Sequence, residues 1–250
     1  MVNKESVSLS LIIPCLNEAE NISLVIERLN EIIAAITYPI EIIIVDGGSD
    51  DETPNILKRE FQSLDKDKFK LILMEQRKGY GNDILEGLKQ AKHDTLAWTH
   101  ADLQTDLKDV IIGFDLYNTI DKKRLIVKGQ RKRRKLMEVI FTTGMQIVSL
   151  FILRINLSDI NAQPKIFPRE FFKSYLQEEA PTDFSLDLYL MYMARMNNYE
   201  IITFPVLFKK RQLGEAKGGG GSWKNRVNLT KRTFTYILKL KRDLIDENKN

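Results

Sequence analysis

Short hydrophobic runs alternate with amphipathic segments along the first half of the chain. Four such runs predict buried strands, and three segments in which apolar positions recur at helical spacing predict helices between them. The strands are expected at Ser8–Ile13, Ile40–Val45, Lys70–Met74 and Thr95–Thr99, and the helices at Glu18–Ala35, Thr53–Phe61 and Asn82–Lys92, the last capped by Asn82. Alternation of this kind favours a mostly parallel central sheet with helices on both faces, an α/β fold.

The second half is less regular. It predicts strands at Leu125–Val127, Lys165–Phe167 and Glu200–Phe208, and a helix at Phe184–Met196. A chain of 250 residues with 43% apolar content can form one large or two small domains. We expect one α/β domain over residues 1–217, a flexible glycine loop over 218–222 and a C-terminal helical appendage over 223–250.

Two segments have the pattern of membrane-surface helices. Leu136–Ile155 is mostly apolar but is interrupted by Glu138, Gln146 and Arg154, so it is a poor match to the roughly 20 apolar residues of a membrane span. An interfacial helix and a buried core helix both remain open. Trp223–Lys241 is aromatic and basic, which fits an amphipathic interfacial helix or a merely solvated one.

The net charge of +4 is mild, and the basic residues cluster in Lys128–Lys135 and Lys209–Lys241. The single cysteine, Cys15, lies inside an apolar run, so we expect it to pack and the compartment to be reducing. The N-terminal segment lacks a signal-peptide pattern, which favours a cytoplasmic location. The basic residues that adjoin apolar segments favour peripheral association with the cytoplasmic face of a membrane. We expect no nucleic-acid partner, because a stacking-aromatic pattern is missing and the conspicuous loops are acidic.

Those acidic loops follow two of the expected strands. Asp46-Gly47-Gly48-Ser49-Asp50-Asp51 follows the second strand, and His100-Ala101-Asp102-Leu103-Gln104 follows the fourth. In an open parallel sheet, ligands bind beyond the carboxyl ends of the strands. Carboxylates there can hold nucleoside hydroxyls directly and a diphosphate through a shared divalent cation. Either loop alone could be a turn with a helix cap, but two together predict a nucleotide-sugar site.

Five motifs resemble family 2 glycosyltransferases, which have the Rossmann-like GT-A fold. They are Leu11–Glu18 with its Pro-x-x-Asn-Glu loop, Val45–Asp51, Gly79–Asn82, Ala101–Gln104 and Phe208–Lys217. The last two are similar to segments of dolichyl- and polyprenyl-phosphate hexose (mannose) synthases. The resemblance spans roughly residues 8–218 and implies a donor site, a divalent metal and a lipid-phosphate acceptor.

The resemblance implies a set of residues that bind the nucleotide-sugar. Glu18 would accept hydrogen bonds from ribose hydroxyls and Asp46 from the base, while the glycines would allow close backbone approach to the nucleotide and diphosphate. The full set is Pro14, Asn17, Glu18, Asp46, Gly47, Gly48, Gly79, Gly81, Asn82, His100 and Ala101.

The second acidic loop departs from the family, whose members usually carry Asp-x-Asp there. His100 replaces the first aspartate, which leaves Asp102 and Gln104 as candidate ligands for Mg²⁺ or Mn²⁺. Three roles stay open for His100: a ligand that favours Mn²⁺, a direct contact to ribose or phosphate, and a neutral hydrogen-bonded side chain. Direct ligation is the least favoured.

The resemblance also implies the catalytic residues Asp102, Arg131, Asp187, Arg211 and Lys217. The three basic side chains would stabilise the leaving diphosphate. Asp187 matches a position that is usually acidic, where it would orient Arg211 or the sugar hydroxyls. The loop Asp159–Lys165 resembles an acceptor-side loop, with Gln163 and Pro164 as departures that alter its shape.

These features predict an inverting glycosyltransferase that moves a hexose from a UDP- or GDP-sugar to a polyprenyl phosphate at a membrane surface. An ionised phosphate nucleophile needs no general base. One alternative is transfer to a sugar hydroxyl in cell-surface polysaccharide synthesis, with Asp187 as base, and another is a nucleotide-sugar-binding protein without turnover. A membrane protein or a second copy of the chain stays open as a further partner. The Gly218–Ser222 run suits a loop that closes over the substrates better than an engineered linker.

Overall fold

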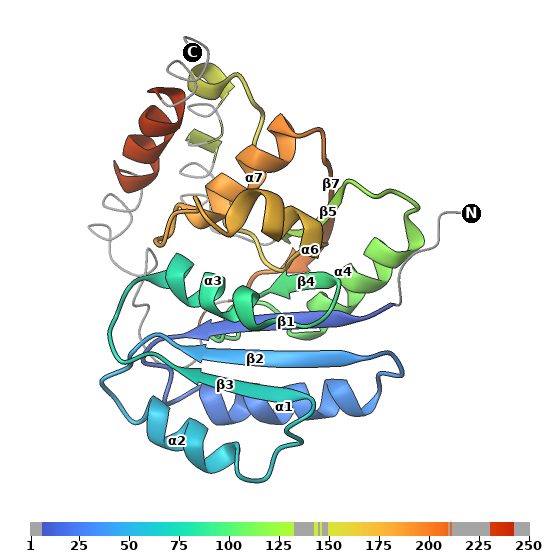
Figure 1. Ribbon diagram of the computed structural model, residues 1–250, viewed down its shortest axis with the longest axis vertical. Coiled ribbons are helices and arrows are strands. Elements are labelled where there is room, and N and C mark those ends of the chain that lie inside the picture. Colours follow the sequence, from blue (N-terminus) through green and yellow to red (C-terminus); the bar gives the residue numbers. More distant parts are fainter. Residues whose placement is uncertain are drawn as a thin grey trace.

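A computed structural model describes residues 7–132, 143, 144, 146, 150–209, 211 and 231–242. Its centre is a seven-stranded sheet with the order β3-β2-β1-β4-β6-β5-β7 (Figure 1). The strands are β1 (Leu9–Cys15), β2 (Ile40–Asp46), β3 (Phe69–Leu73), β4 (Thr95–Trp98), β5 (Leu125–Lys132), β6 (Lys165–Pro168) and β7 (Glu200–Leu207). The helices are α1 (Ile22–Ala34), α2 (Thr53–Glu60), α3 (Tyr80–Gln90), α4 (Lys108–Thr119), α6 (Arg169–Phe171), the π-helix η1 (Phe172–Leu176) and α7 (Leu186–Met196). Residues 231–242 form one more helix.

The sheet is mostly parallel, with one reversed strand. β1 pairs in parallel with β2 and β4, and β2 with β3, so the carboxyl ends of these strands share one edge of the sheet. β6 runs antiparallel to both β4 and β5. Its register places Lys165 beside Trp98 on one side and Lys128 on the other. The reversal therefore brings a basic side chain to the edge at which the acidic loops begin.

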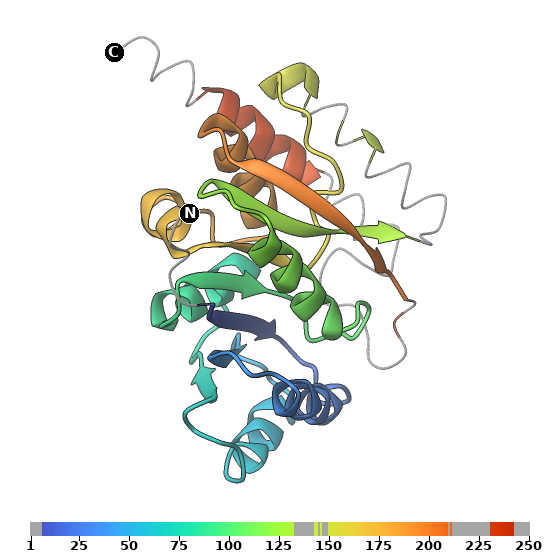
Figure 2. The ribbon, with the colours of Figure 1, turned by 90° about the vertical axis from the view of Figure 1, so that its right-hand side faces the viewer.

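Helices cover the sheet on both faces. One core packs α1, α2 and α4 against the sheet, and the other packs α3, α6, η1 and α7 against the opposite face. Figure 2 shows α1 and α4 on one side of the strands and α3 and α6 on the other. The central strands are buried on both faces, which explains why β1 and β2 read as nearly continuous apolar runs.

The predicted α/β class and mostly parallel sheet are confirmed, and element bounds differ by a few residues. α1 begins at Ile22 rather than Glu18. α3 begins at Tyr80, with Gly79 rather than Asn82 at its N-cap. β5 extends to Lys132 because it pairs along its whole length with β7. The helices α4, α6 and η1 were not predicted. Cys15 is buried and unpaired, as expected.

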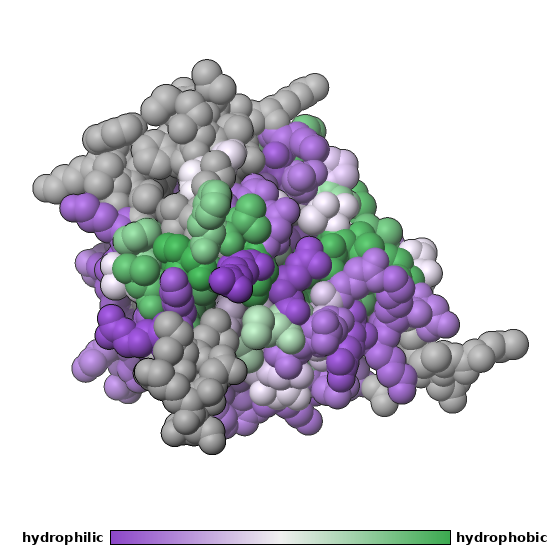
Figure 3. All heavy atoms as spheres, turned by 90° about the horizontal axis from the view of Figure 1, so that it is seen from above, coloured by the Kyte–Doolittle hydropathy of each residue, from purple (hydrophilic) through white to green (hydrophobic). Residues whose placement is uncertain are grey.

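Within the described residues, no helix is both long and apolar enough to cross a membrane. Most of the Leu136–Ile155 segment, the 218–222 glycine run and part of the C-terminal appendage lie outside the described residues. On the upper face, hydrophobic side chains gather in patches between hydrophilic ones (Figure 3). Exposed apolar side chains of the described residues include Phe151 in residues 150–153, and Phe234 and Leu238 in the 231–242 helix.

Candidate active site

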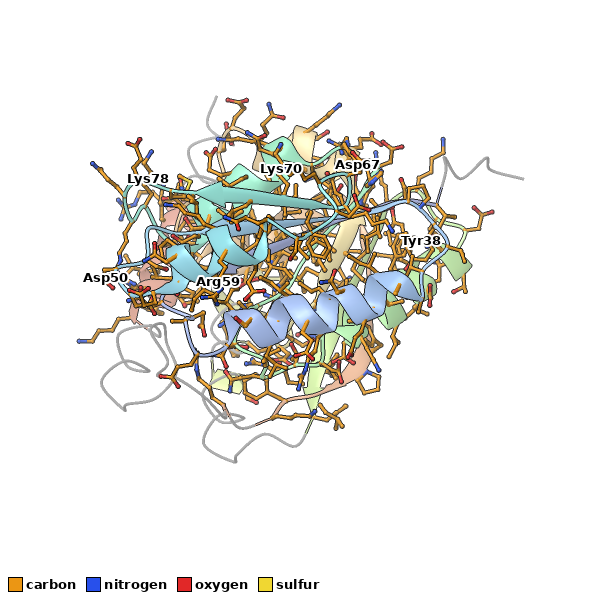
Figure 4. The ribbon with its side chains drawn as sticks, turned by 90° about the horizontal axis from the view of Figure 1, so that it is seen from below. Tyr38, Asp50, Arg59, Asp67, Lys70 and Lys78 are labelled. Atoms are coloured by element: carbon orange, nitrogen blue, oxygen red, sulfur yellow. The ribbon has the colours of Figure 1, made fainter. Side chains whose placement is uncertain are left out.

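The loops that follow β1 and β2 are fastened to each other at the carboxyl edge of the sheet. The Asn17 side chain donates to Asp50 Oδ1 at 2.6 Å and accepts from the Asp50 backbone N–H at 3.0 Å. The Asn17 backbone N–H donates to Ser49 Oγ at 2.8 Å. Asn17 has φ 55°, a left-handed conformation that asparagine tolerates better than most residues. Figure 4 shows Asp50 and Lys78 at one end of the molecule and Tyr38 at the other.

Asp46 is 1% exposed and shapes the second of these loops from within. Its carboxylate accepts the Ser49 hydroxyl at 2.5 Å and the Ser49 backbone N–H at 3.2 Å. Pro14 is a buried residue of β1, in register with Val45. The contact of Asp46 with the base stays a prediction, as does the role of Pro14.

A second buried carboxylate, Asp83, lies against this loop and was not singled out from the sequence. A Cβ on Gly47 would come within 2.3 Å of Asp83 Oδ2, so any other residue at position 47 would require the Asp83 side chain to shift. The pKa of Asp83 is raised to about 6, mainly by burial; a hydrogen bond with Asn82 opposes the shift and the charge of Asp46 adds to it. The close pair of carboxylates accounts for the glycine that follows Asp46.

The Gly79–Asn82 turn packs on the loop that leads into α7. Gly79 has φ 118°, and a Cβ there would meet Thr182 O at 2.6 Å. At Gly81 a Cβ would meet Pro181 O at 2.5 Å. The Asn82 backbone N–H donates to Thr182 O at 2.9 Å. These glycines are therefore required by the protein's own backbone, whatever they contribute to diphosphate binding.

The loop after β4 presents Asp102 in a tight turn. The Gln104 backbone N–H donates to Asp102 Oδ1 at 3.0 Å, and Leu103 between them has φ 55°. Burial raises the pKa of Asp102, but a hydrogen bond and positive charge from His100, the Gln104 N–H and the charge of Arg211 together lower it below its ordinary value. Asp102 is therefore ionised. Ala101 is buried beside it.

The donor set of this loop fits a divalent cation that takes most of its ligands from elsewhere. Asp102 and the amide oxygen of Gln104 are hard oxygen donors, and Gln104 Nε2 donates to Lys209 O at 3.2 Å, which leaves its oxygen for other contacts. Among the described residues, no group of three His, Cys, Asp or Glu side chains could hold a metal ion. Mg²⁺ and Mn²⁺ suit such a site when a diphosphate and water complete the coordination.

Arg211 reaches the first loop from the far end of the chain. Its guanidinium donates to Glu18 Oε2 at 2.5 Å, and Asn21 Nδ2 donates to the same oxygen at 2.6 Å. The sequence suggested Asp187 as the carboxylate that orients Arg211, whereas the structure gives Glu18 this contact. Glu18 is only 8% exposed, so the ion pair is well sheltered from solvent.

Asp187 lies in the first turn of α7, buried and paired with Lys165. Lys165 Nζ donates to Asp187 Oδ1 and to Ala162 O at 3.2 Å. Gln163 Nε2 donates to the same Asp187 oxygen at 3.1 Å. Burial lowers the pKa of Lys165, although the Asp187 charge opposes the shift. Lys165 was not singled out from the sequence, because a lysine in an apolar strand gives no signal of its carboxylate partner.

Arg131 is held by a carboxylate of the acceptor-side loop. Asp159 accepts from the Arg131 backbone N–H at 2.7 Å and from its guanidinium at 2.9 Å and 2.5 Å. The guanidinium also lies 5.2 Å from the ring centre of Phe208. A role of Arg131 in binding phosphate stays a prediction. Its contacts with Asp159 also stabilise the 159–165 loop. Lys217 lies outside the described residues.

Lys128, in the same strand, begins the basic cluster noted in the sequence and is wholly buried. Its ammonium donates to three backbone carbonyls, those of Gly129 at 3.1 Å, Ser158 at 3.2 Å and Asp159 at 2.9 Å. Burial, then the charge of Lys165, lowers the pKa of Lys128 to about 7, although Asp159 opposes the shift. The Lys128 ammonium therefore holds the backbone at the start of the acceptor-side loop.

Comparison with known sequences gives a family model and several relatives. The model described as glycosyl transferase family 2 matches residues 10–180. Glycosyltransferase AglD of Haloferax volcanii is 25% identical over 209 residues, which cover 80% of this chain and 33% of that protein. The dolichyl-phosphate beta-glucosyltransferase of Dictyostelium discoideum is 22% identical over 249 residues, which cover 94% and 76%. The chain thus spans about a third of the length of the first relative.

Solved structures share the fold at low identity. Glucosyl-3-phosphoglycerate synthase from Mycobacterium tuberculosis, in complex with Mn²⁺, UDP-glucose and phosphoglyceric acid, superposes with a TM-score of 0.70 at 14% identity, covering 94% of this chain and 79% of that one. The mannosyltransferase PcManGT from Pyrobaculum calidifontis, in complex with GDP-Man and Mn²⁺, gives a TM-score of 0.59 at 20% identity, covering 83% and 58%.

Proposed function

The chain belongs to glycosyltransferase family 2, and from this premise we propose that it transfers a hexose, with inversion, from a UDP- or GDP-sugar to a polyprenyl phosphate. The observation that carries the proposal is the ionised Asp102 at the carboxyl end of β4, whose pKa is lowered in part by the nearby Arg211. A carboxylate such as Asp102 can bind the metal of a metal-bound diphosphate, and a guanidinium such as that of Arg211 can bind its phosphate oxygens. The fastened loops of Asn17 and Asp50 form the neighbouring wall, where the nucleoside would bind.

The metal would be held by Asp102 and Gln104 together with the donor diphosphate. A bound Mg²⁺ or Mn²⁺ supplies neutralisation of the charge that develops on the leaving diphosphate. Mn²⁺ is present in the complexes of both structural neighbours, one with a UDP-sugar and one with a GDP-sugar. Arg211 would add a second positive charge, with Lys217 as a further candidate.

A basic pocket at the segment before α7 supports a phosphate acceptor. It has a volume of about 330 Å³ and lies between the 231–242 helix and the segment before α7. Its lining residue Asp183 directly follows Thr182, whose carbonyl accepts from the Asn82 backbone N–H. Three basic side chains face it, enough to attract a lipid phosphate. Its lining is Asp183, Ser185, Lys231, Arg232, Thr235, Tyr236 and Lys239.

Exposed apolar side chains near this pocket support peripheral binding to a membrane. Phe151 is 79% exposed, and Phe234 and Leu238 are about half as exposed on the 231–242 helix. The 231–242 helix lies at the upper left of the molecule in Figure 1, and residues 150–153 lie at its top. Apolar and basic groups together favour the anionic cytoplasmic leaflet. A polyprenyl chain would then stay in the bilayer while its phosphate enters the pocket.

The environment of Asp187 argues against the hydroxyl-acceptor alternative. A general base must reach the proton that it abstracts, whereas Asp187 is 2% exposed and engaged by Lys165 and Gln163. A phosphate acceptor needs no such base, since it is already ionised near neutral pH. The catalytic contribution of the protein is then positioning and charge stabilisation.

The test is incubation with a panel of UDP- and GDP-sugars, Mg²⁺ or Mn²⁺, and a short polyprenyl phosphate, with radiolabelled lipid as readout. Labelled lipid from one donor supports the proposal and names the donor. Transfer only to a sugar hydroxyl would support the polysaccharide alternative. Tight donor binding without transfer or hydrolysis under every condition would refute a catalytic role.

The acceptor pocket has its own test. Arg232→Ala should raise the KM for polyprenyl phosphate about tenfold and leave the KM for the donor sugar unchanged, since charge-assisted phosphate contacts contribute about 1.5–3 kcal/mol. Lys241→Ala is the matched control, because Lys241 lies on the same helix and does not line the pocket. Equal effects of the two variants would show a general electrostatic contribution and refute this acceptor site.

A further inference from the structure

Asp159, the first residue of the acceptor-side loop, has an unusual backbone conformation. Its φ is 44°, in the left-handed region that few residues with a side chain adopt, although aspartate does so more often than most. Such conformations persist where the surrounding structure holds them, and they are concentrated at ligand sites and active sites. The contacts that hold Asp159 therefore indicate what this loop is shaped to do.

Two cations of β5 hold Asp159, one through its backbone and one through its side chain. The Lys128 ammonium donates to the carbonyls of Asp159 at 2.9 Å, Ser158 at 3.2 Å and Gly129 at 3.1 Å. The Asp159 carboxylate accepts from the Arg131 guanidinium at 2.9 Å and 2.5 Å, and from the Arg131 backbone N–H at 2.7 Å. Lys128 thus sets where the Asp159 backbone lies, and the Asp159 carboxylate sets the orientation of the Arg131 guanidinium.

The end of β5 lies at the edge of the sheet that carries the acidic loops. β4 and β5 are both antiparallel to β6, so they run in the same direction. The Phe208 backbone N–H donates to Lys132 O at 3.3 Å, and the next N–H, that of Lys209, donates to Gln104 O at 2.7 Å. The Arg131 guanidinium, 5.2 Å from the ring centre of Phe208, is therefore near the loop of the candidate metal ligands.

Lys128 lies too deep to contact a substrate itself. It is 0% exposed, and burial, then the charge of Lys165, lowers its pKa to about 7. An apolar side chain at this position would avoid the burial of a charge, but it could not donate to three carbonyls. The contribution of Lys128 is therefore to the conformation of the backbone that these carbonyls belong to.

We propose that Lys128 is a positioning residue, whose ammonium holds Asp159 so that Asp159 presents the Arg131 guanidinium to the donor diphosphate. This inference rests on the proposed function, in which a nucleoside diphosphate binds at the edge of the sheet that carries Asp102. The Asp159 contacts use Nε and Nη2 of the guanidinium, whose other N–H groups can bind phosphate oxygens. A guanidinium that is already oriented loses less conformational freedom on binding, which favours binding.

The first test measures the affinity for UDP and for GDP, each with Mn²⁺, by calorimetry at about pH 6, below the pKa of Lys128. Lys128→Met keeps an unbranched side chain and removes the donors, so it should weaken binding of the preferred diphosphate by at least about fivefold. Arg131→Ala should weaken it by about tenfold or more, because it removes a charge-assisted contact. Lys132→Met, at an exposed residue of the same strand, is the matched control and should change the affinity less than about twofold.

Two further variants separate positioning from a general loss of structure. If Lys128 acts through Arg131, Lys128→Met should weaken binding by less than about twofold when Arg131 is already alanine. Asp159→Asn should also weaken binding, and it keeps the proposal testable if Lys128→Met does not fold. Equal losses from Lys128→Met with and without Arg131, an effect of Lys132→Met as large as that of Lys128→Met, or unchanged affinity in Asp159→Asn would overturn the proposal.

Amide hydrogen exchange tests the loop without any ligand. The Ala162 backbone N–H donates to Asp159 O at 3.0 Å, so it reports on the same oxygen that Lys128 holds. Its exchange should be at least about tenfold faster in Lys128→Met than in the parent protein, and unchanged in Lys132→Met. An unchanged rate in Lys128→Met would overturn the positioning role. Neither measurement needs turnover, so a parent protein that fails to transfer sugar would count against the proposed function alone.

Discussion

The buried Lys165–Asp187 pair makes the sharpest prediction. Asp187→Asn leaves the Lys165 ammonium, which is fully buried, without its countercharge. Removing one partner of a buried ion pair costs about 3–5 kcal/mol, and the amide oxygen can still accept one hydrogen bond, so we expect about 3 kcal/mol. For a chain of this size, that corresponds to a fall in Tm of roughly 6–12 °C. Asp115→Asn, at an exposed carboxylate of α4, is the matched control and should change stability by less than about 0.5 kcal/mol.

The effect should depend on pH in a defined direction. Burial lowers the pKa of Lys165 in the folded protein, and Asp187 opposes this shift, so the Asn variant lowers that pKa further. Between the folded pKa and the ordinary value of about 10.4, the unfolded chain binds more protons than the folded one, so the stability of the variant rises with pH. The loss relative to the parent protein should therefore be smaller at about pH 9.5 than at about pH 7.

Urea denaturation at the two pH values measures both effects. The double variant Lys165→Met, Asp187→Leu removes both charges and should recover stability relative to Asp187→Asn, since apolar replacements of buried pairs are often neutral. A loss below about 1 kcal/mol for Asp187→Asn at pH 7, or a loss that does not change with pH, would refute the reasoning. A stable variant that specifically lost transfer to a hydroxyl acceptor would restore Asp187 as a general base.

Three further predictions follow from other parts of the site. Asp102→Ala should lower transfer at least about 100-fold while Asp115→Ala leaves it unchanged, and full activity in excess chelator would remove the metal from the mechanism. Asp83→Asn should stabilise the protein by up to about 3 kcal/mol near pH 7.5, because the pKa of Asp83 is about 6 in the folded protein and 3.8 is its ordinary value. Deprotonation of Asp83 therefore lowers the stability of the parent protein as the pH rises through this range, and the gain of the variant should vanish in urea titrations near pH 4. Gly129→Ala should cost at least about 2 kcal/mol in the same assay, since its Cβ would lie 2.0 Å from Gln163 O, and a neutral effect would contradict this contact.

Periodicity predicted the first half of the fold well because β1 to β4 are sequential, parallel and buried. It missed α4, whose apolar positions give only a weak amphipathic pattern. It also could not predict that β6 runs antiparallel between β4 and β5, because the direction of a four-residue strand depends on tertiary pairing. The extension of β5 to Lys132 likewise depends on its pairing with β7.

Motifs located the acidic loops and the basic positions, but not the partners of each charge. Asn17 and Glu18 were identified by resemblance, whereas the contact of Glu18 with Arg211 joins residues 193 positions apart. The buried lysines Lys128 and Lys165 gave no signal, since charge in a sequence reads as exposure. Polar networks of this kind depend on the three-dimensional arrangement, and their members become recognisable only when the strands that carry them are placed side by side.

The contact between the Gly79–Asn82 turn and Thr182 has a consequence for how this protein can diversify. Two segments about a hundred positions apart touch through backbone atoms, with a hydrogen bond of 2.9 Å from Asn82 and no room for a Cβ at Gly79 or Gly81. Side-chain changes at positions other than these two glycines can be accepted singly, but an insertion or a shift of register in one segment would need a matching change in the other. Relatives with new acceptors are therefore expected to vary beyond this junction, in the segments that lead away from it, and to inherit the junction itself as one unit.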